Sequence, residues 1–173
     1  MNPNKKTKPL ILGFCASSSG SGKTTLIEKI IPILKANNLI ISVVKHAHHS
    51  FDIDTPGKDS YRLRKSGSYQ TLVLSQDRSA LITESHGNNI DIEDTIQKMD
   101  QNVDMILIEG LKTLPYKKIE VFRKDASHEK LYASNKSIIA IATDTNDKEN
   151  IPSLNINKPE EVCAFILNLM DKT

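Results

Sequence analysis

The sequence predicts an α/β fold in which helices cover both faces of a mostly parallel β-sheet. Short apolar runs typical of strands alternate along the chain with longer stretches whose apolar residues recur at helical spacing. The first apolar run, residues 10–16, leads into a glycine-rich turn and then into a helical pattern. This strand, turn and helix order is the local unit on which open parallel sheets are built.

Each element is predicted from its own pattern. Strands are expected at 10–16, 39–46, 70–75, 79–84, 103–108, 118–123 and 137–143, and helices at 23–36, 58–66, 91–100 and 158–171. Region 110–136 is polar and contains one clear strand, so we expect it to project from the sheet as a hairpin or partner-facing loop.

Length and composition favour one domain over residues 1–173, with residues 1–9 as a flexible tail. The net charge of +2 gives no electrostatic argument for binding nucleic acid or an acidic membrane. No apolar run approaches the ~20 residues that span a bilayer. Cys15 and Cys163 are expected to be buried thiols in a reducing compartment, which predicts a cytoplasmic location.

A phosphate-binding loop (P-loop) is predicted at residues 17–25, Ser-Ser-Ser-Gly-Ser-Gly-Lys-Thr-Thr, with Ser17 in place of the usual first glycine. Backbone N–H groups here would surround a phosphate at the positive end of the following helix. Lys23 would reach the β- and γ-phosphates, and the Thr24 hydroxyl would bind Mg²⁺. The predicted nucleotide-binding residues are Ser19, Gly20, Ser21, Gly22, Lys23, Thr24, Thr25 and Lys45.

A second element of the predicted nucleotide site is an acidic residue, Glu109, at the end of an apolar strand. A carboxylate at this position would emerge near Thr24 and help to hold Mg²⁺, as a Walker B acid does. Thr24 and Glu109 are therefore the predicted magnesium residues. The base of the nucleotide is not decided by any motif, although Asp144 follows a predicted strand and either faces a base or forms an acidic turn.

Residues 45–60 hold three histidines, three acids and two lysines, and they follow a predicted strand. One interpretation is a phosphate and Mg²⁺ environment, with Lys45 and Lys58 as anion contacts and Asp52 or Asp54 orienting water. A transition-metal site and a solvated polar loop are the alternatives. In a metal site, His46 and His48 would share one face of a continued strand, which His49 would not, and Asp52 and Asp54 would add oxygen ligands. The candidates for a catalytic role are Lys23, Asp52, Asp54 and Glu109.

Taken together, these residues resemble the MobB family of molybdopterin-guanine dinucleotide biosynthesis adapter proteins. The resemblance extends from Leu10 to about Leu169. It rests on Ser-Gly-Ser-Gly-Lys-Thr-Thr-Leu at 19–26, on Ile-Leu-Ile-Glu-Gly-Leu-Lys at 106–112, and above all on Lys45-His46-Ala47-His48-His49-x-Phe51-Asp52-x-Asp54-x-Pro56-Gly57-Lys58-Asp59-Ser60, followed by Arg62 and Lys65-Ser66-Gly67.

The resemblance implies a P-loop NTPase fold with three layers, of the dethiobiotin-synthetase-like class. It further implies a homodimer that binds GTP with Mg²⁺, has at most weak GTPase activity and acts mainly as an adapter. The implied partner is a MobA-type nucleotidyltransferase, which joins GMP to molybdopterin, together with other molybdopterin pathway proteins. From the residues alone, a P-loop kinase or ligase acting on a small molecule and a metal-delivery NTPase remain alternatives.

Overall fold

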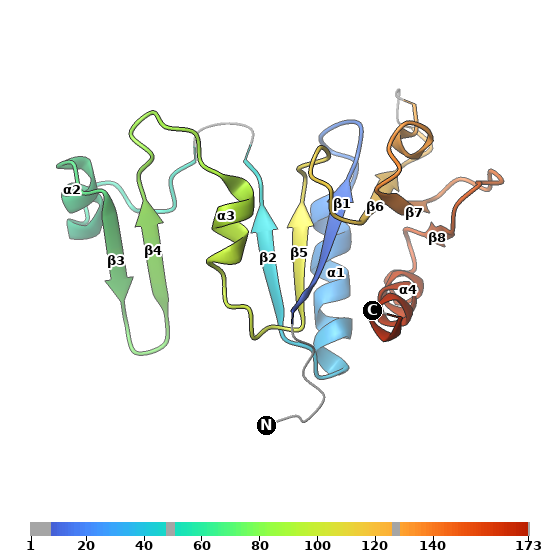
Figure 1. The fold of residues 1–173 in the computed structure, drawn as a ribbon, viewed down its shortest axis with the longest axis horizontal. Helices are drawn as coiled ribbons and strands as arrows, with labels where there is room; N and C mark the ends of the chain where they lie inside the picture. The colour runs from blue at the N-terminus through green and yellow to red at the C-terminus, as the bar shows by residue number, and fades with distance from the viewer. Residues whose placement is uncertain (1–7, 48–50, 126–128, 173) are drawn as a thin grey trace. The chain divides into compact units, whose positions relative to one another are not determined.

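The computed structural model describes residues 8–47, 51–125 and 129–172. The chain divides into two compact units (Figure 1). The first combines Met1–His46 with Asp100–Thr173, and the second is Ala47–Met99. That residues 1–173 fold as one domain stays a prediction, and most of the tail predicted at residues 1–9 lies outside the described ranges.

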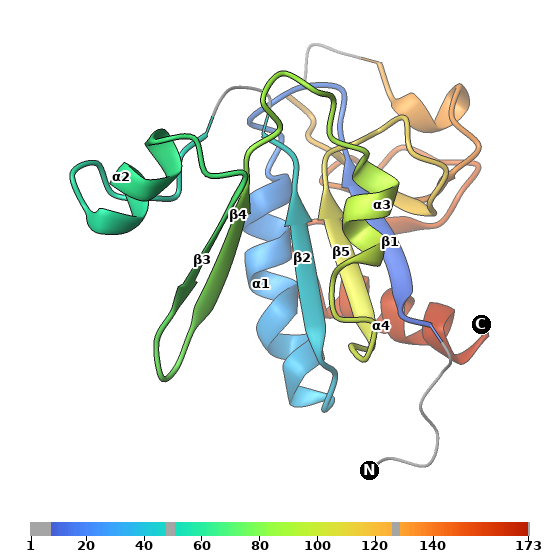
Figure 2. The same cartoon turned by 60° about the vertical axis from the view of Figure 1, so that its left-hand side comes forward.

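The first unit is built on a six-stranded sheet in which every neighbouring pair is parallel. The strand order is β2-β5-β1-β6-β7-β8, and Figure 2 shows β2, β5 and β1 side by side. The strands are β1 (Leu10–Cys15), β2 (Ile41–Lys45), β5 (Met105–Glu109), β6 (Lys118–Phe122), β7 (Ile138–Thr143) and β8 (Ser153–Asn155). The predicted parallel α/β fold is thus confirmed, with the short edge strand β8 as an addition.

Two long helices, α1 (Lys23–Ala36) and α4 (Pro159–Asp171), pack against each other and against one face of this sheet. Side chains alternate between the two faces of a strand, so every second residue of β1 and β5 joins this core. Leu12, Phe14, Met105 and Leu107 are fully buried there. Burying apolar side chains of this size contributes ~1.5–3 kcal/mol each, so this face anchors the fold.

The strand predicted at 118–123 is confirmed as β6, but the expectation that region 110–136 projects from the sheet is wrong for this strand. Strand β6 lies inside the sheet between β1 and β7, and all of its residues are buried. Its two charged side chains, Lys118 and Glu120, point to the face opposite α1 and α4. They are buried because the flanking backbone satisfies their polar atoms, which removes most of the cost of burying charge.

These contacts fold the polar segments over the sheet. The Lys118 ammonium donates to the carbonyls of Leu114 and Tyr116, the latter at 2.8 Å. Glu120 accepts from the backbone N–H groups of Leu131 and Tyr132 at 2.6 and 2.9 Å, at the short 3₁₀ helix Leu131–Ala133. A Cβ on Gly13 would lie 2.9 Å from Lys118 Cγ, so glycine leaves the space that this lysine occupies.

The second unit contains α2 (Asp59–Lys65), the antiparallel hairpin β3 (Gln70–Leu74) and β4 (Ser79–Thr83), and α3 (Ile92–Gln97). Helix α3 begins after Asp91, whose side chain accepts from the Asp94 N–H at 2.9 Å. It ends at Gln97 and is shorter than the predicted helix at 91–100. Among the described residues, β3 and β4 form a sheet of their own and pair with no other strand.

Both cysteines are buried free thiols, as predicted. Burial raises the pKa of Cys15 to about 12 and that of Cys163 to about 11, so both thiols are neutral and unreactive at physiological pH. Within the described ranges, no helix has the length and apolar character needed to cross a bilayer.

Replacing Lys118 with Ala is expected to destabilise the protein by about 2–4 kcal/mol, because two part-buried carbonyls lose their donor and a cavity forms in place of the buried side chain. The control is Lys117→Ala, which removes the neighbouring exposed lysine and should change stability by less than about 0.5 kcal/mol. Urea unfolding followed by circular dichroism measures both. Equal stabilities for the two variants would contradict the structural role given to Lys118.

Candidate functional site

The carboxyl ends of three neighbouring strands bring together the residues predicted to bind a nucleotide. Strand β5 lies between β1 and β2, and Glu109 at its end pairs in register with Phe14 of β1 and Lys45 of β2. The loop that follows β1 carries residues 17–25 and leads into α1. Ligands of open parallel sheets gather at this edge, where the strand order reverses.

The loop at residues 17–25 has the backbone geometry that its glycines predict. Gly20 and Gly22 have φ values of +73° and +92°, a left-handed conformation that a side chain disfavours. Gly22 is the N-cap residue of α1, so the first turn of the helix opens directly from the loop. Ser19 and Gly20 are exposed at the loop tip, whereas Ser21 is buried.

The Glu109 carboxylate is the centre of the site. Thr24 donates its hydroxyl to Glu109 Oε1 at 2.7 Å, and the Lys45 ammonium lies 2.7 Å from the same oxygen. Lys45 also donates to Thr24 Oγ1 at 3.4 Å. The Glu109 side chain is 12% exposed and that of Lys45 is 60% exposed. Burial alone would raise the pKa of Glu109, but the hydrogen bonds from Lys45 and Thr24 outweigh it and hold that pKa below its usual value.

Lys23 folds back over the loop from the first turn of α1. Its ammonium donates to the Ser18 carbonyl at 3.0 Å and to Ser21 Oγ at 3.1 Å. Burial lowers the pKa of Lys23, and the nearby Glu109 charge partly opposes this shift. The positive charge is therefore held at the loop by contacts that an anion can replace. Thr25 is exposed on the same helical turn.

His46 is exposed, and its backbone N–H donates to the Glu109 carbonyl at 3.2 Å. A Cβ added to Gly110, which has a φ of +96°, would lie 3.6 Å from His46 Cβ. His48 and His49 lie outside the described residues. Within 8–47, 51–125 and 129–172, no three His, Cys, Asp or Glu side chains form a group that could hold a metal ion.

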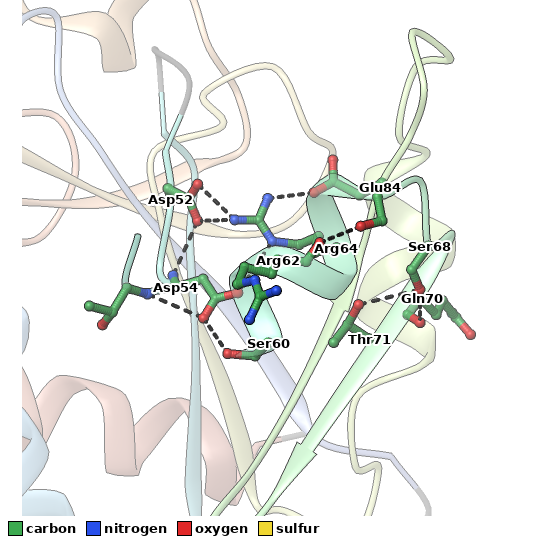
Figure 3. A network of polar contacts seen from close by, with 11 residues as sticks. Asp52, Asp54, Ser60, Arg62, Arg64, Ser68, Gln70, Thr71 and Glu84 are labelled. Carbon is green, nitrogen blue, oxygen red and sulfur yellow. Dashed lines mark hydrogen bonds and ion pairs between the residues drawn. The ribbon is translucent and has the colours of Figure 1, made fainter. Parts of the chain in front are cut away.

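Asp52 and Asp54 belong to the second unit, where both face the buried Arg64 of α2 (Figure 3). The Arg64 guanidinium lies 2.6 Å from Asp52 Oδ1 and 3.5 Å from Asp54 Oδ2, and it reaches Glu84 at 2.6 Å. Hydrogen bonding to Arg64 holds the pKa of Asp52 below its usual value. Three carboxylates thus share one arginine, and this unit carries its own ionic core. A role for Asp52 and Asp54 at the nucleotide stays a prediction.

Burial of Arg64 was not predicted, because an arginine in a helix is usually exposed. The available signal for a buried basic partner was the pair of acids two residues apart, Asp52 and Asp54. Beside this cluster, a pocket of about 570 Å³ combines apolar side chains with the ionic ones. It is lined by Ala47, Phe51, Asp52, Ile53, Arg64, Lys65, Ile82, Thr83, Glu84, Ser85 and Ile90.

Asp144 directly follows β7, and both oxygens of its carboxylate accept hydrogen bonds from other groups of the protein. Its Oδ2 accepts from Arg123 Nη1 at 3.1 Å, and its Oδ1 accepts from the Lys124 N–H at 2.7 Å. Burial raises the pKa of Asp144, but these two hydrogen bonds bring the pKa below its usual value. Arg123 follows β6 directly and is a second basic residue that the sequence analysis missed. The rule that ligands gather at strand ends would have found it once the strand order was known.

The donor chemistry of the site suits a hard cation. Thr24 and Glu109 present oxygen atoms, which Mg²⁺ prefers, and Mg²⁺ usually keeps several waters and binds phosphate oxygens in addition. Two protein oxygens beside the glycine-containing loop therefore fit the needs of a magnesium ion that carries a nucleotide. A parallel sheet, a glycine-containing loop between β1 and α1, and an acid at the end of the neighbouring strand define a protein of the P-loop NTPase fold class.

Comparisons with known proteins agree with this class and narrow it. Residues 11–144 match the family model described as MobB, Molybdopterin guanine dinucleotide synthesis protein B. The molybdopterin-guanine dinucleotide biosynthesis adapter protein of Escherichia coli (strain K12) is 42% identical over 171 residues, which cover 96% of this chain and 97% of that protein. The protein of the same name from Haemophilus influenzae is 36% identical, covering 87% of this chain and 84% of its own. The chain belongs to the MobB family.

Solved structures show the same fold. A crystal structure of a molybdopterin-guanine biosynthesis protein B matches with a TM-score of 0.70 and 25% identity, covering 92% of this chain and 99% of the other. The Bacillus subtilis MobB structure matches with a TM-score of 0.71 and 24% identity, covering 92% of this chain and 96% of the other.

Proposed function

We propose that this chain is an adapter protein of molybdopterin-guanine dinucleotide biosynthesis that binds GTP with Mg²⁺. Membership of the MobB family supports the pathway, because its relatives carry that name. The observation that carries the nucleotide site is the convergence of Thr24, Lys45 and Glu109 beside the loop at residues 17–25. The proposed partner is a MobA-type nucleotidyltransferase, and the proposed location is the cytoplasm.

The proposed roles follow from charge and position. The loop N–H groups from Ser19 to Thr25 would surround the β-phosphate, and Lys23 would exchange its contacts with Ser18 and Ser21 for phosphate oxygens. Thr24 would bind Mg²⁺ directly, with Glu109 beside it. Mg²⁺ would supply charge neutralisation between the β- and γ-phosphates.

Lys45 would change partner when the metal nucleotide binds. Its ammonium is 2.7 Å from the Glu109 oxygen that faces Thr24, the place where a divalent cation would exert the same attraction. Two cations on one carboxylate oxygen repel each other, so Lys45 would move to the phosphates. The exposure of its side chain allows this movement without disturbing the core.

A homodimer is proposed from the hairpin of the second unit. Leu72 and Leu81 pair in register, so they share one face with Leu74, and all three are more than half exposed. An isolated two-stranded hairpin is marginal in water, and its edges offer unpaired N–H and C=O groups. A second copy of the hairpin would cover this apolar face in a symmetric interface.

The adapter role is tested with the chain and a MobA-type transferase together. The wild-type chain should bind GTP with Mg²⁺, turn it over slowly alone, and raise the rate of GMP attachment to molybdopterin. Lys23→Ala should weaken GTP binding about 100-fold, because it removes a charged contact to phosphate, and should abolish the stimulation. Lys29→Ala, which removes an exposed lysine of the same helix, is the matched control. Calorimetry and a coupled transfer assay measure both effects.

Unchanged GTP affinity in folded Lys23→Ala protein would contradict the nucleotide site. Rapid transfer of the γ-phosphate to a small molecule by the chain alone would support the kinase or ligase alternative instead of an adapter.

Glu109→Gln should reduce GTP affinity about tenfold in the presence of Mg²⁺ and much less without it, because the lost charge acts through the metal. Glu28→Gln, at an exposed position of α1, should have no effect in either condition. Titrations with Mg²⁺ and with EDTA measure the difference. Equal losses in the two conditions would remove Glu109 from the metal site.

The double variant Leu72→Lys with Leu81→Lys should dissociate the proposed dimer, raising its dissociation constant at least about 100-fold, because two ammonium groups cannot be buried without partners. Ile40→Lys, which places the same charge at an exposed apolar position of the first unit, should leave the dimer intact. Sedimentation velocity measures the mass of each protein. A dimer that persists in the double variant would show that the hairpin face is not the interface.

A further inference from the structure

A second polar cluster lies on the side of the loop away from Glu109. In the sheet order, β5 borders β1 on one side and β6 borders it on the other. Arg123, the residue after β6, approaches Gly22, where an added Cβ would lie 3.7 Å from its Nε and 3.8 Å from its Nη2. The guanidinium therefore lies against the junction between the loop and α1.

The orientation of Arg123 is fixed from the side facing away from Gly22. Its Nη1 donates to Asp144 Oδ2 at 3.1 Å and to Asn157 Oδ1 at 3.0 Å. The carboxylate of Asp144 is fixed in turn by the Lys124 N–H at 2.7 Å. Two separate segments of the first unit, at Asp144 and Asn157, thus hold one guanidinium in place.

The two Arg123 nitrogens nearest the loop keep their hydrogen-bonding capacity. Among the described residues, neither Nε nor Nη2 has a hydrogen-bond acceptor, and 37% of the Arg123 side chain is exposed. The buried Ile156 lies beside the same position, with its Cδ1 3.9 Å from the Cβ added to Gly22. A guanidinium held by one edge, with donors and a planar face left open, is suited to binding a ligand.

The position of Arg123 matches one end of a nucleoside triphosphate. The proposed metal site lies at the end of β5, and Mg²⁺ joins the β- and γ-phosphates, so the γ-phosphate end belongs on that side. The strand β1 separates β5 from β6, and two strand spacings amount to roughly 10 Å. An extended nucleotide that has its γ-phosphate near Glu109 and its β-phosphate in the loop would carry its ribose and base toward β6 and β7.

We propose that Arg123, held by Asp144 and Asn157, binds the nucleoside half of the nucleotide, an inference that rests on the proposed nucleotide site. The guanidinium plane stacks against the purine, and Nε or Nη2 donates to a ribose oxygen. Asp144 and Asn157 are positioning residues for Arg123. The loop, Lys23 and the metal bind the phosphates in this arrangement.

The test compares GTP with inorganic triphosphate, which has the phosphates and lacks the nucleoside. With Mg²⁺ present, Arg123→Ala should weaken GTP binding about tenfold or more and change triphosphate binding less than about threefold. Arg123→Lys should keep the GTP defect, because lysine carries the charge without the planar face. Lys124→Ala removes an exposed charge at the next position and is the matched control. Calorimetry measures the affinities, and circular dichroism establishes that each variant is folded.

Selective loss of GTP affinity supports the inference, and so does an Arg123→Ala variant that binds GTP no more tightly than it binds triphosphate. Unchanged GTP affinity in Arg123→Ala, or equal losses for GTP and triphosphate, would overturn it while leaving the nucleotide site in place. A wild-type chain that binds neither ligand would contradict the proposed nucleotide site itself.

Discussion

The site depends on the contacts that the Glu109 carboxylate makes with the Thr24 hydroxyl and the Lys45 ammonium. It exists because β5 lies between β1 and β2, which places the ends of three parallel strands at one edge. The loop at residues 17–25 leaves β1 at the same edge, so the backbone that is proposed to bind phosphate lies beside the carboxylate. The apolar core beneath α1 and α4 fixes these strands and therefore fixes the distance from Thr24 to Glu109.

The electrostatics of this edge explain how it can receive a charged ligand. Lys23 and Lys45 are both held by groups of the protein, at the Ser18 carbonyl and the Glu109 carboxylate. Each contact satisfies a positive charge that would otherwise repel its neighbour in a half-buried space. Under the proposed function, a magnesium nucleotide would replace both contacts together, because its phosphates would attract the lysines while its metal would take the place of Lys45 at Glu109. Metal and anion binding are thus expected to support each other.

The sequence predicted the elements whose signals are local. An apolar run followed by a glycine-rich loop indicated β1 and its loop, and an apolar run ending in an acid indicated β5 and Glu109. The missed features depend on tertiary contacts. The strand β6 was predicted, but its place inside the sheet was missed, because the burial of Lys118 and Glu120 depends on backbone partners in the loops before and after the strand and on the space above Gly13. Arg64 and Arg123 were missed for the same reason, since each acts through carboxylates from other segments.

The central role of Glu109 is tested most directly by a crystal structure of the chain with Mg²⁺ and a non-hydrolysable GTP analogue. It should show the phosphates in the loop at residues 17–25, Mg²⁺ bound to Thr24 Oγ1 beside Glu109, and the Lys45 ammonium moved from Glu109 to a phosphate oxygen. Phosphates bound elsewhere, or a nucleotide in the loop with the Lys45–Glu109 pair intact and no metal between Thr24 and Glu109, would contradict the central role of this carboxylate.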